Sequence, residues 1–194
     1  LPNYIEIATA DQLVAYSNYV NALSNQNATR ETTVVLTADI NMAGKAWNPI
    51  KRFIGTFDGQ GHTISNLSYT ATGTASNVGA FMTDIANNNA NGRVKNIVFD
   101  NCTLTVALDN NNAYAGIVAA KADRGNLTNV TVKNSKLLGN AMKAAGIVAE
   151  ACWGIGDGHV IDCTVEDTLI VATQKTAALV GRVTGSDEVV IRNN

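Results

Sequence analysis

The segment RVKNIVFD at residues 93–100 recurs as NLTNVTVK at 126–133 and as HVIDCTVE at 159–166. Apolar anchors follow one another at intervals of 30, 33, 33 and 31 residues, at Ile64, Val94, Leu127, Val160 and Ile191. Apolar and polar side chains alternate after each anchor, which is the pattern of a β-strand. We therefore expect equivalent strands of successive repeats to stack. Their predicted internal column consists of Leu67, Ile97, Val130 and Cys163.

Two polar columns accompany this apolar one. The first predicted column consists of Asn66, Asn96, Asn129 and Asp162, each two residues after an anchor. Side-chain amides tolerate left-handed backbone and can hydrogen-bond along a stack, so we predict a structural ladder. The second predicted column, Thr70, Asp100, Lys133 and Glu166, faces outward. It places opposite charges on adjacent strands, and this supports the alignment.

A second motif leads each repeat, as VGAF at 78–81, AGIV at 115–118, AGIV at 145–148 and AALV at 177–180. Each repeat is then expected to hold about three short strands separated by Gly- or Asn-rich corners, a unit that cannot bury its apolar face alone. Stacking of such units predicts an all-β fold, a right-handed parallel β-helix of about five rungs over residues 61–194.

The first 60 residues differ from the repeats and are predicted to form an N-terminal cap, continuous with the solenoid in one domain. The sequence TADQ at 9–12 has the form of a capping box, and apolar residues follow at helical spacing. We expect a helix over about residues 10–24 and a strand at 33–37. The helix is expected to cover the open end of the solenoid.

The composition excludes several classes of protein. The chain has 194 residues, 24 asparagines, 16 glycines and only 15% charged residues, which favours strands and turns over helix bundles. Its formal net charge of -2 argues against a nucleic-acid partner. The sequence contains no apolar run long enough for a membrane span.

The segment WNPI at 47–50, followed by FIGTFDGQGHTISNL at 53–67, resembles the start of bacterial GLUG-repeat proteins. Imperfect copies of that family's Gly-Leu-any-Gly signature occur as GIVA at 116–119, GIVA at 146–149 and ALVG at 178–181. The resemblance implies an extracellular or surface-anchored bacterial protein of the adhesin-like kind. The family also includes repeat regions attached to IgA-specific metallopeptidases, in which the repeats are not the catalytic part.

Residues suited to catalysis or metal binding are few in this sequence. The chain has only two histidines and no HExxH or paired-cysteine spacing, so we predict no metal site, no cofactor and no enzyme activity. The alternative is a polysaccharide hydrolase or lyase. Asp100 and Glu166 lie two rungs apart, roughly 9–10 Å by strand spacing. Lys133 lies between them, which favours a surface charge ladder.

The loop ACWGIGDGH at 151–159 is the most individual part of the repeats. Trp153 could stack on a sugar ring, and Asp157 and His159 could hydrogen-bond its hydroxyls, so these three are the predicted binding residues. A tryptophan that covers the base of its own loop would give the same sequence, and this alternative stays open.

These observations predict a non-enzymatic cell-surface or secreted module, an adhesin that binds a host extracellular protein or glycan. Lipid anchoring through a removed N-terminal segment is one option for display. Two alternatives remain: a glycan-processing β-helix, and an accessory or spacer region of a larger surface enzyme. The step from fold to adhesion is an analogy. The sequence leaves the ligand and the oligomeric state open.

Overall fold

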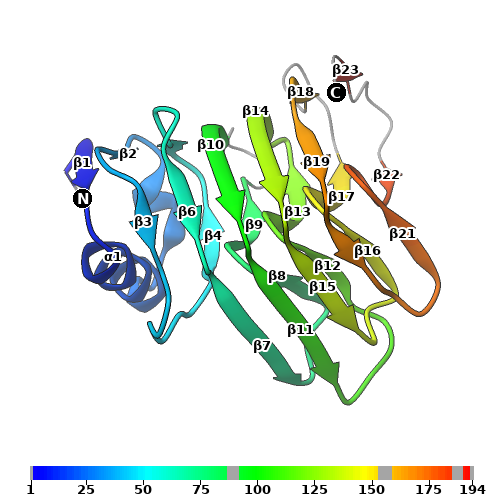
Figure 1. Cartoon of the computed structure of the whole chain (residues 1–194). Helices are drawn as coiled ribbons and strands as arrows, with labels where there is room; N and C mark the ends of the chain where they lie inside the picture. The colour runs from blue at the N-terminus through cyan, green and yellow to red at the C-terminus, as the bar shows by residue number, and fades with distance from the viewer. Residues whose placement is uncertain (1, 87–91, 153–158, 185–189, 193–194) are drawn as a thin grey trace.

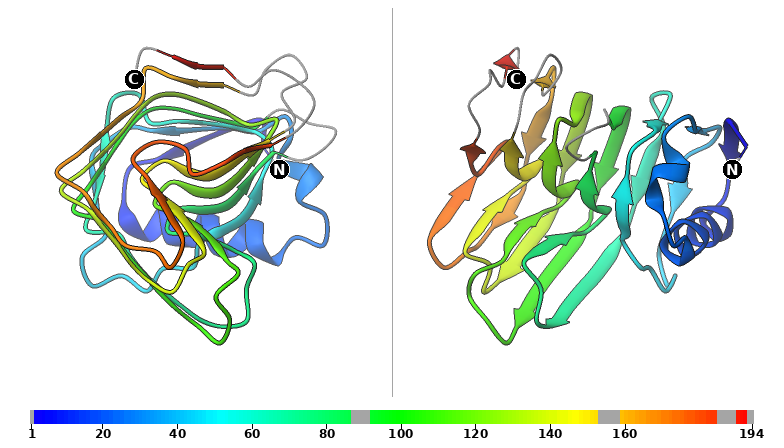
Figure 2. Two further views of the ribbon diagram at one scale, coloured as in Figure 1. Left: turned by 90° about the vertical axis from the view of Figure 1, so that its right-hand side faces the viewer. Right: turned by 180° about the vertical axis from the view of Figure 1, so that it is seen from behind.

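Strands of successive coils pair in parallel throughout the computed structural model, which describes residues 2–86, 92–152, 159–184 and 190–192. The fold is a right-handed parallel β-solenoid of about five turns, with one α-helix near the N-terminus (Figure 1). Viewed along the axis, the coils superpose as stacked loops (Figure 2). The predicted fold class is confirmed.

The strands form four sheets, named here in the order in which a coil visits them. The first sheet holds β1 (Tyr4–Ile7), β2 (Thr33–Leu36), β3 (Ile40–Asn41), β5 (Thr56–Asp58), β6 (Thr63–Ser65), β10 (Arg93–Asp100), β14 (Asn126–Lys133), β18 (His159–Ile161), β19 (Thr164–Glu166) and β23 (Val190–Arg192). The second holds β7 (Ser68–Gly73), β11 (Thr103–Leu108), β15 (Lys136–Gly139) and β20 (Leu169–Ile170). The third holds β8 (Asn77–Gly79), β12 (Tyr114–Gly116), β16 (Lys143–Ala145) and β21 (Lys175–Ala177). The fourth holds β4 (Ile50–Phe53), β9 (Met82–Ile85), β13 (Ala119–Asp123), β17 (Val148–Cys152) and β22 (Val183–Thr184).

Each full coil therefore has one strand more than the three that the sequence predicted. The difference arises at the AGIV motif at 115–118, which is not one strand: its first two residues end β12, and the next two form a corner before β13. Gly116 ends β12 and Ala119 begins β13, and a Cβ on Gly116 would lie only 1.9 Å from the carbonyl oxygen of Ala119. Glycine allows this sharp corner, so the coil bends inward where the third sheet meets the fourth (Figure 2). We call this edge of the molecule the inner corner.

The interior is filled by aliphatic columns and, toward the N-terminal end, by an aromatic cluster. Phe81 is at its centre: the ring stacks on Trp47 at 6.1 Å and contacts Phe57 and Phe99 at 5.0 and 4.9 Å between centroids. The indole nitrogen of Trp47 donates to the carbonyl of Ala80, 2.7 Å away. Burial of large rings is the main stabilising contribution at this end of the core.

The predicted internal column is correct for three of its four members. Ile97 pairs with Val130, and Cys163 stands opposite Val130 because Thr128 and Thr131 on either side pair with Ile161 and Thr164. All of these inward residues are buried. Leu67 is also buried, but it belongs to another column, because Ser65 pairs with Asp100 and Ser68 with Thr103, which leaves Leu67 opposite Cys102.

The polar ladder shows the same shift. Left-handed residues form two columns, one of Asn96, Asn129 and Asp162 and one of Asn66, Asn101, Asn134 and Asp167. Asn129 donates to Asn96 over 3.1 Å, whereas Asn66 accepts from Asn101 over 2.7 Å. The placement of Asn66 with Asn96 was therefore wrong.

The cause of the shift is that both corners of the first sheet use the same left-handed conformation and so carry similar sequences. In the first coil the earlier corner is made by Gln60 and Gly61, with φ of 51° and 84°, and not by asparagine. Gly59 lies beneath Ile97, where a Cβ would come within 2.5 Å of the isoleucine Cβ. A leucine could not occupy that place.

Helix α1 (Ala10–Ala22) confirms the predicted helix, ending two residues earlier, and a 3-10 turn (Gln26–Thr29) follows. The capping box is present: Thr9 Oγ1 accepts from the Gln12 backbone at 3.3 Å, and the Gln12 side chain accepts from the Thr9 backbone at 3.2 Å. Leu13 and Val20 are buried in the same core as the strands. The helix thus lies against the N-terminal end of the solenoid (Figure 1).

Candidate functional site

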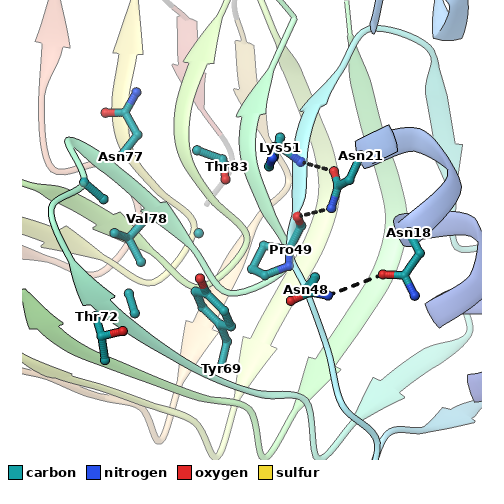
Figure 3. A pocket seen from close by; sticks show the side chains of 13 residues that line it. Asn18, Asn21, Asn48, Pro49, Lys51, Tyr69, Thr72, Asn77, Val78 and Thr83 are labelled. Carbon is teal, nitrogen blue, oxygen red and sulfur yellow. Dashed lines mark hydrogen bonds between the residues drawn. The ribbon is translucent and has the colours of Figure 1, made fainter. Parts of the chain in front are cut away.

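A pocket of about 360 Å³ lies between α1, the segment before β4, and strands β7 and β8 (Figure 3). Its volume falls at the small end of the range for small-molecule sites. The described residues of the lining combine amides, hydroxyls, one lysine and one aromatic ring with small apolar residues, and none of them is a carboxylate. The side chains that set its chemistry are Asn18, Asn48, Lys51, Tyr69, Thr72 and Asn77.

The pocket exists because the first coil is incomplete. β7 and β8 are the N-terminal edge strands of the second and third sheets, so no earlier strand lies beside them. Helix α1 stands where a preceding coil would otherwise continue the stack. A helix cannot reproduce the flat edge of a strand, and a recess remains between them.

Asn21 fixes the helix against this recess. Its amide nitrogen donates to the Pro49 carbonyl at 2.9 Å, and its side-chain oxygen accepts from the Lys51 backbone at 2.9 Å. Both ends of the amide are therefore used by the fold. Asn21 holds the wall of the pocket in place and is not free for a ligand.

Asn18 and Asn48 are in a different situation. Both are exposed, and the Asn48 amide nitrogen donates to the Asn18 oxygen over 3.4 Å. This leaves the Asn18 amide hydrogens and the Asn48 side-chain oxygen without a partner among the residues that the structure describes. Hydrogen-bond donors of Asn18 and an acceptor of Asn48 therefore remain available, and sugar hydroxyls can use both.

Tyr69 supplies an aromatic surface. Its ring is half-buried and packs against the core, and Figure 3 shows it beside Asn48 and Thr72 in the wall of the pocket. Because β7 is an edge strand, no neighbouring strand covers Tyr69 on the side of the helix. A ring flanked by amides offers stacking together with hydrogen bonding.

An alternating charge ladder runs along the outer face of the fourth sheet. In register, it consists of Arg52, Asp84, Lys121, Glu150 and Arg182. A second column faces it from the third sheet and consists of Asn77, Tyr114, Lys143 and Lys175. Asn77 donates to Asp84 over 3.1 Å, so the two columns meet at the inner corner.

A smaller pocket of about 110 Å³ lies at this corner, lined in part by Asn77, Asp84, Lys121 and Asp123. Burial raises the pKa of Asp84 and of Asp123, although neighbouring cations oppose the shift. One carboxylate oxygen of Asp123 is buried without a hydrogen-bond partner. In the described part of the chain, no three His, Cys, Asp or Glu residues gather to hold a metal ion.

The predicted binding loop cannot be compared with this geometry. Trp153 and Asp157 lie outside the described residues. His159 begins β18, where its backbone pairs with Val190, but its side chain is also outside the description. The proposed role of these three residues stays a prediction.

Asp100 and Glu166, the two carboxylates considered for a polysaccharide hydrolase or lyase, belong to a charge ladder on the surface of the first sheet. Asp100 pairs with Lys133 and Lys133 with Glu166, and the Lys133 ammonium is 3.7 Å from Asp100 Oδ2. Ser65, not Thr70, stands opposite Asp100, for the reason given for Leu67. The lysine neutralises Asp100, as in a charge-paired sheet surface.

Sequence reasoning missed Tyr69, Asn18 and Asn48 as site residues. No local motif marks them, because the pocket joins segments that are far apart in the chain. The inner corner had a usable signal. Four polar pairs seven residues apart flank the corner motif: Asn77 with Asp84, Tyr114 with Lys121, Lys143 with Glu150 and Lys175 with Arg182.

The fold and pocket define a β-solenoid module with an amide-lined pocket, and comparison with known proteins adds little more. No protein-family model matches the chain. It is similar to halomucin from Haloquadratum walsbyi, with 34% identity over 129 residues. That match covers 58% of this chain but only 1% of halomucin.

Among solved structures, the chain resembles a crystal structure from Bacteroides ovatus that is provisionally described as an immunoglobulin A1 protease. The identity is 15% and the TM-score 0.34, with 96% of this chain and 83% of the other covered. No helix in the described part of the chain has the length and apolarity needed to cross a membrane.

Proposed function

We propose that this chain is a non-enzymatic binding module of a surface-displayed or secreted protein, and that the pocket at Tyr69 binds a neutral sugar unit of a glycan. One observation carries the proposal: the pocket combines an aromatic face with free amide groups and has no carboxylate. Sugars present hydroxyls that need such donors and acceptors and apolar ring faces that stack on aromatic rings. An adhesin role follows if the glycan is on a host cell.

The setting of the site supports display outside the cell. The chain is similar to a small part of halomucin, and its sequence resembles GLUG-repeat surface proteins. A rigid solenoid holds its sites in fixed positions, so weak contacts of several modules can act together. Host extracellular proteins belong to the same proposal as alternative ligands.

The experiment is a glycan and extracellular-matrix array probed with the whole chain and with pocket variants. Tyr69→Phe keeps the ring and should keep most binding, whereas Tyr69→Ala should lose it. Asn18→Ala should weaken binding because a free amide is removed at an exposed position. Tyr19→Ala serves as the matched control. Tyr19 is 52% exposed, lies next to Asn18 on α1 and does not line the pocket.

Two results would contradict this assignment. Binding that is equal in wild type and Tyr69→Ala would remove the pocket from the site. Binding that is lost in Trp153→Ala but retained in Tyr69→Ala would transfer the site to the loop at 151–159. An array without any bound ligand would favour the spacer role.

The second candidate function is glycan processing, and Asp84 and Asp123 favour it. Both are carboxyls with raised pKa, and Asn77 lines both their pocket and the larger one. A general acid needs a raised pKa of this kind. Mass spectrometry of a bound oligosaccharide decides the matter: shortened products that disappear in Asp84→Asn would establish an enzyme, and an intact ligand supports a binding module.

A further inference from the structure

Two outward charge columns of this solenoid obey one rule. On the first sheet Asp100, Lys133 and Glu166 alternate in sign from coil to coil. On the fourth sheet the ladder from Arg52 to Arg182 alternates over five coils. Neighbouring strands are only about 4.8 Å apart, so like charges in register repel and opposite charges stabilise.

The third sheet breaks this rule. Lys175 of β21 stands directly opposite Lys143 of β16. The side chain of Lys175 is exposed and makes no ion pair or hydrogen bond within the described part of the molecule, whereas its backbone N–H donates to the Met142 carbonyl. In the other two ladders the strands on either side of a lysine carry carboxylates, Asp100 and Glu166 beside Lys133, and Asp84 and Glu150 beside Lys121. A sequence selected for folding alone would do the same here.

Lys143 itself is unusual because it is a buried lysine, with only 9% of the residue exposed. Its ammonium lies 3.2 Å from the Tyr114 hydroxyl and 4.5 Å from the centroid of that ring. No carboxylate of the described residues pairs with it. A buried cation that lacks an anion is costly to hold, and it is a ready partner for an incoming negative group.

Arg182 converges on the same point from the fourth sheet. Its guanidinium donates to the Tyr114 hydroxyl at 2.8 Å and pairs with Glu150 at 3.5 Å. Among the described residues that contact Arg182, Glu150 is the one carboxylate, and Thr184 also donates to it, at 2.9 Å. In the two columns that meet at the inner corner, the described cations outnumber the described carboxylates, although the whole chain carries a formal charge of -2.

We propose that Tyr114, Lys143, Lys175 and Arg182 form a binding site for an acidic group, carboxylate or sulfate, of a charged polysaccharide. Lys175 and Arg182 are exposed and supply the donors that a ligand meets first. The buried Lys143 supplies a fixed positive charge beneath them. An anion bridging Lys143 and Lys175 restores the alternation that the protein alone lacks.

The inference rests on the proposed function because it names the kind of glycan. Asn77, which lines the Tyr69 pocket, and Lys175 are members of the same column, three coils apart. Strand spacing puts them roughly 14 Å apart along the axis. One polysaccharide chain can therefore place a neutral unit in the pocket and an acidic unit at the corner.

The test compares dextran sulfate, polygalacturonate and uncharged dextran of similar length, using calorimetry at low and high salt. The wild-type chain should bind one or both acidic polymers, more weakly at high salt, and should prefer them to dextran. Lys175→Glu should weaken this binding by about tenfold or more, since it replaces a charge-assisted contact with repulsion. Lys136→Glu makes the same change at an exposed strand position on the second sheet and should leave binding unchanged.

A second readout separates this site from a general loss of structure. Lys175→Glu faces Lys143 with an opposite charge, so its urea midpoint should rise while its binding falls. Equal binding of the acidic polymers by wild type and Lys175→Glu would overturn the proposal. Polyglutamate is acidic but is not a glycan, so wild-type binding of polyglutamate as strong as that of the acidic polysaccharides would overturn it too. The sulfate and uronate polymers show which acidic group is preferred. If the wild-type chain binds no acidic polymer but keeps Tyr69-dependent glycan binding, only this inference fails. If it binds acidic polymers without any Tyr69-dependent binding, only the pocket proposal fails.

Discussion

Substitution of Asn129 by alanine and by glycine tests why asparagine recurs at the corners of the first sheet. Asn129 has a φ of 54°, and its amide donates to Asn96 over 3.1 Å. Alanine loses the hydrogen bond, about 0.5–1.5 kcal/mol. It also takes on the strain of left-handed backbone, about 1–2 kcal/mol. Glycine loses the hydrogen bond but adopts this backbone freely, so it should be less destabilising than alanine by about 1 kcal/mol.

Urea unfolding followed by circular dichroism measures both free energies of unfolding. Lys136 provides the control, because it is an exposed residue in the extended strand β15. At that position glycine should be more destabilising than alanine, the opposite order. If alanine and glycine rank the same way at both positions, left-handed backbone is not the reason for Asn129. If Asn129→Ala leaves the free energy of unfolding unchanged, the amide ladder does not contribute to stability.

Three further perturbations test other parts of the structure. Phe81→Ala should cost about 3–5 kcal/mol in urea unfolding because it empties the centre of the aromatic cluster, and a loss below about 1 kcal/mol would contradict the packing described. Gly116→Ala should lower the thermal midpoint strongly, since its Cβ would meet the Ala119 carbonyl at 1.9 Å, whereas an unchanged midpoint would refute the sharp corner. Burial raises the pKa of Asp123 above its ordinary 3.8, so the folded state holds this proton more tightly and its contribution to stability falls as pH rises through the folded pKa. Asp123→Asn should therefore gain stability relative to wild type at pH 7 and lose that advantage toward pH 4, as thermal melts at both values would show.

The internal column shows how far the sequence alone could go. Ile97, Val130 and Cys163 were placed correctly because their repeats are equally long and their strands alternate strictly. Leu67 was misplaced because the local pattern is the same at both corners of the first sheet. Only the pairing of Ser65 with Asp100 identifies which corner the residue follows. Local sequence encodes the conformation of a corner, and its place in the stack depends on coil length.

The candidate pocket could not be predicted from the sequence for a different reason: its residues come from segments that are far apart in the chain. Asn18 comes from the helix and Asn48 from the segment before β4, whereas Tyr69 comes from an edge strand. Their proximity depends on how the helix docks, and Asn21 determines this through two backbone contacts. Nothing in the spacing of these residues records that arrangement.

Both candidate sites occur where the regularity of the solenoid fails. Within the repeats, each coil satisfies the polar groups of its neighbours, and inward columns are filled, so a regular coil has little left to offer a ligand. At the Tyr69 pocket the repetition stops because a helix replaces a coil, and amide groups remain free. At Lys143 and Lys175 the strands continue but the alternation of charge stops, and positive charge remains uncompensated. In a solenoid, departures from the repeat are therefore the first places to look for function.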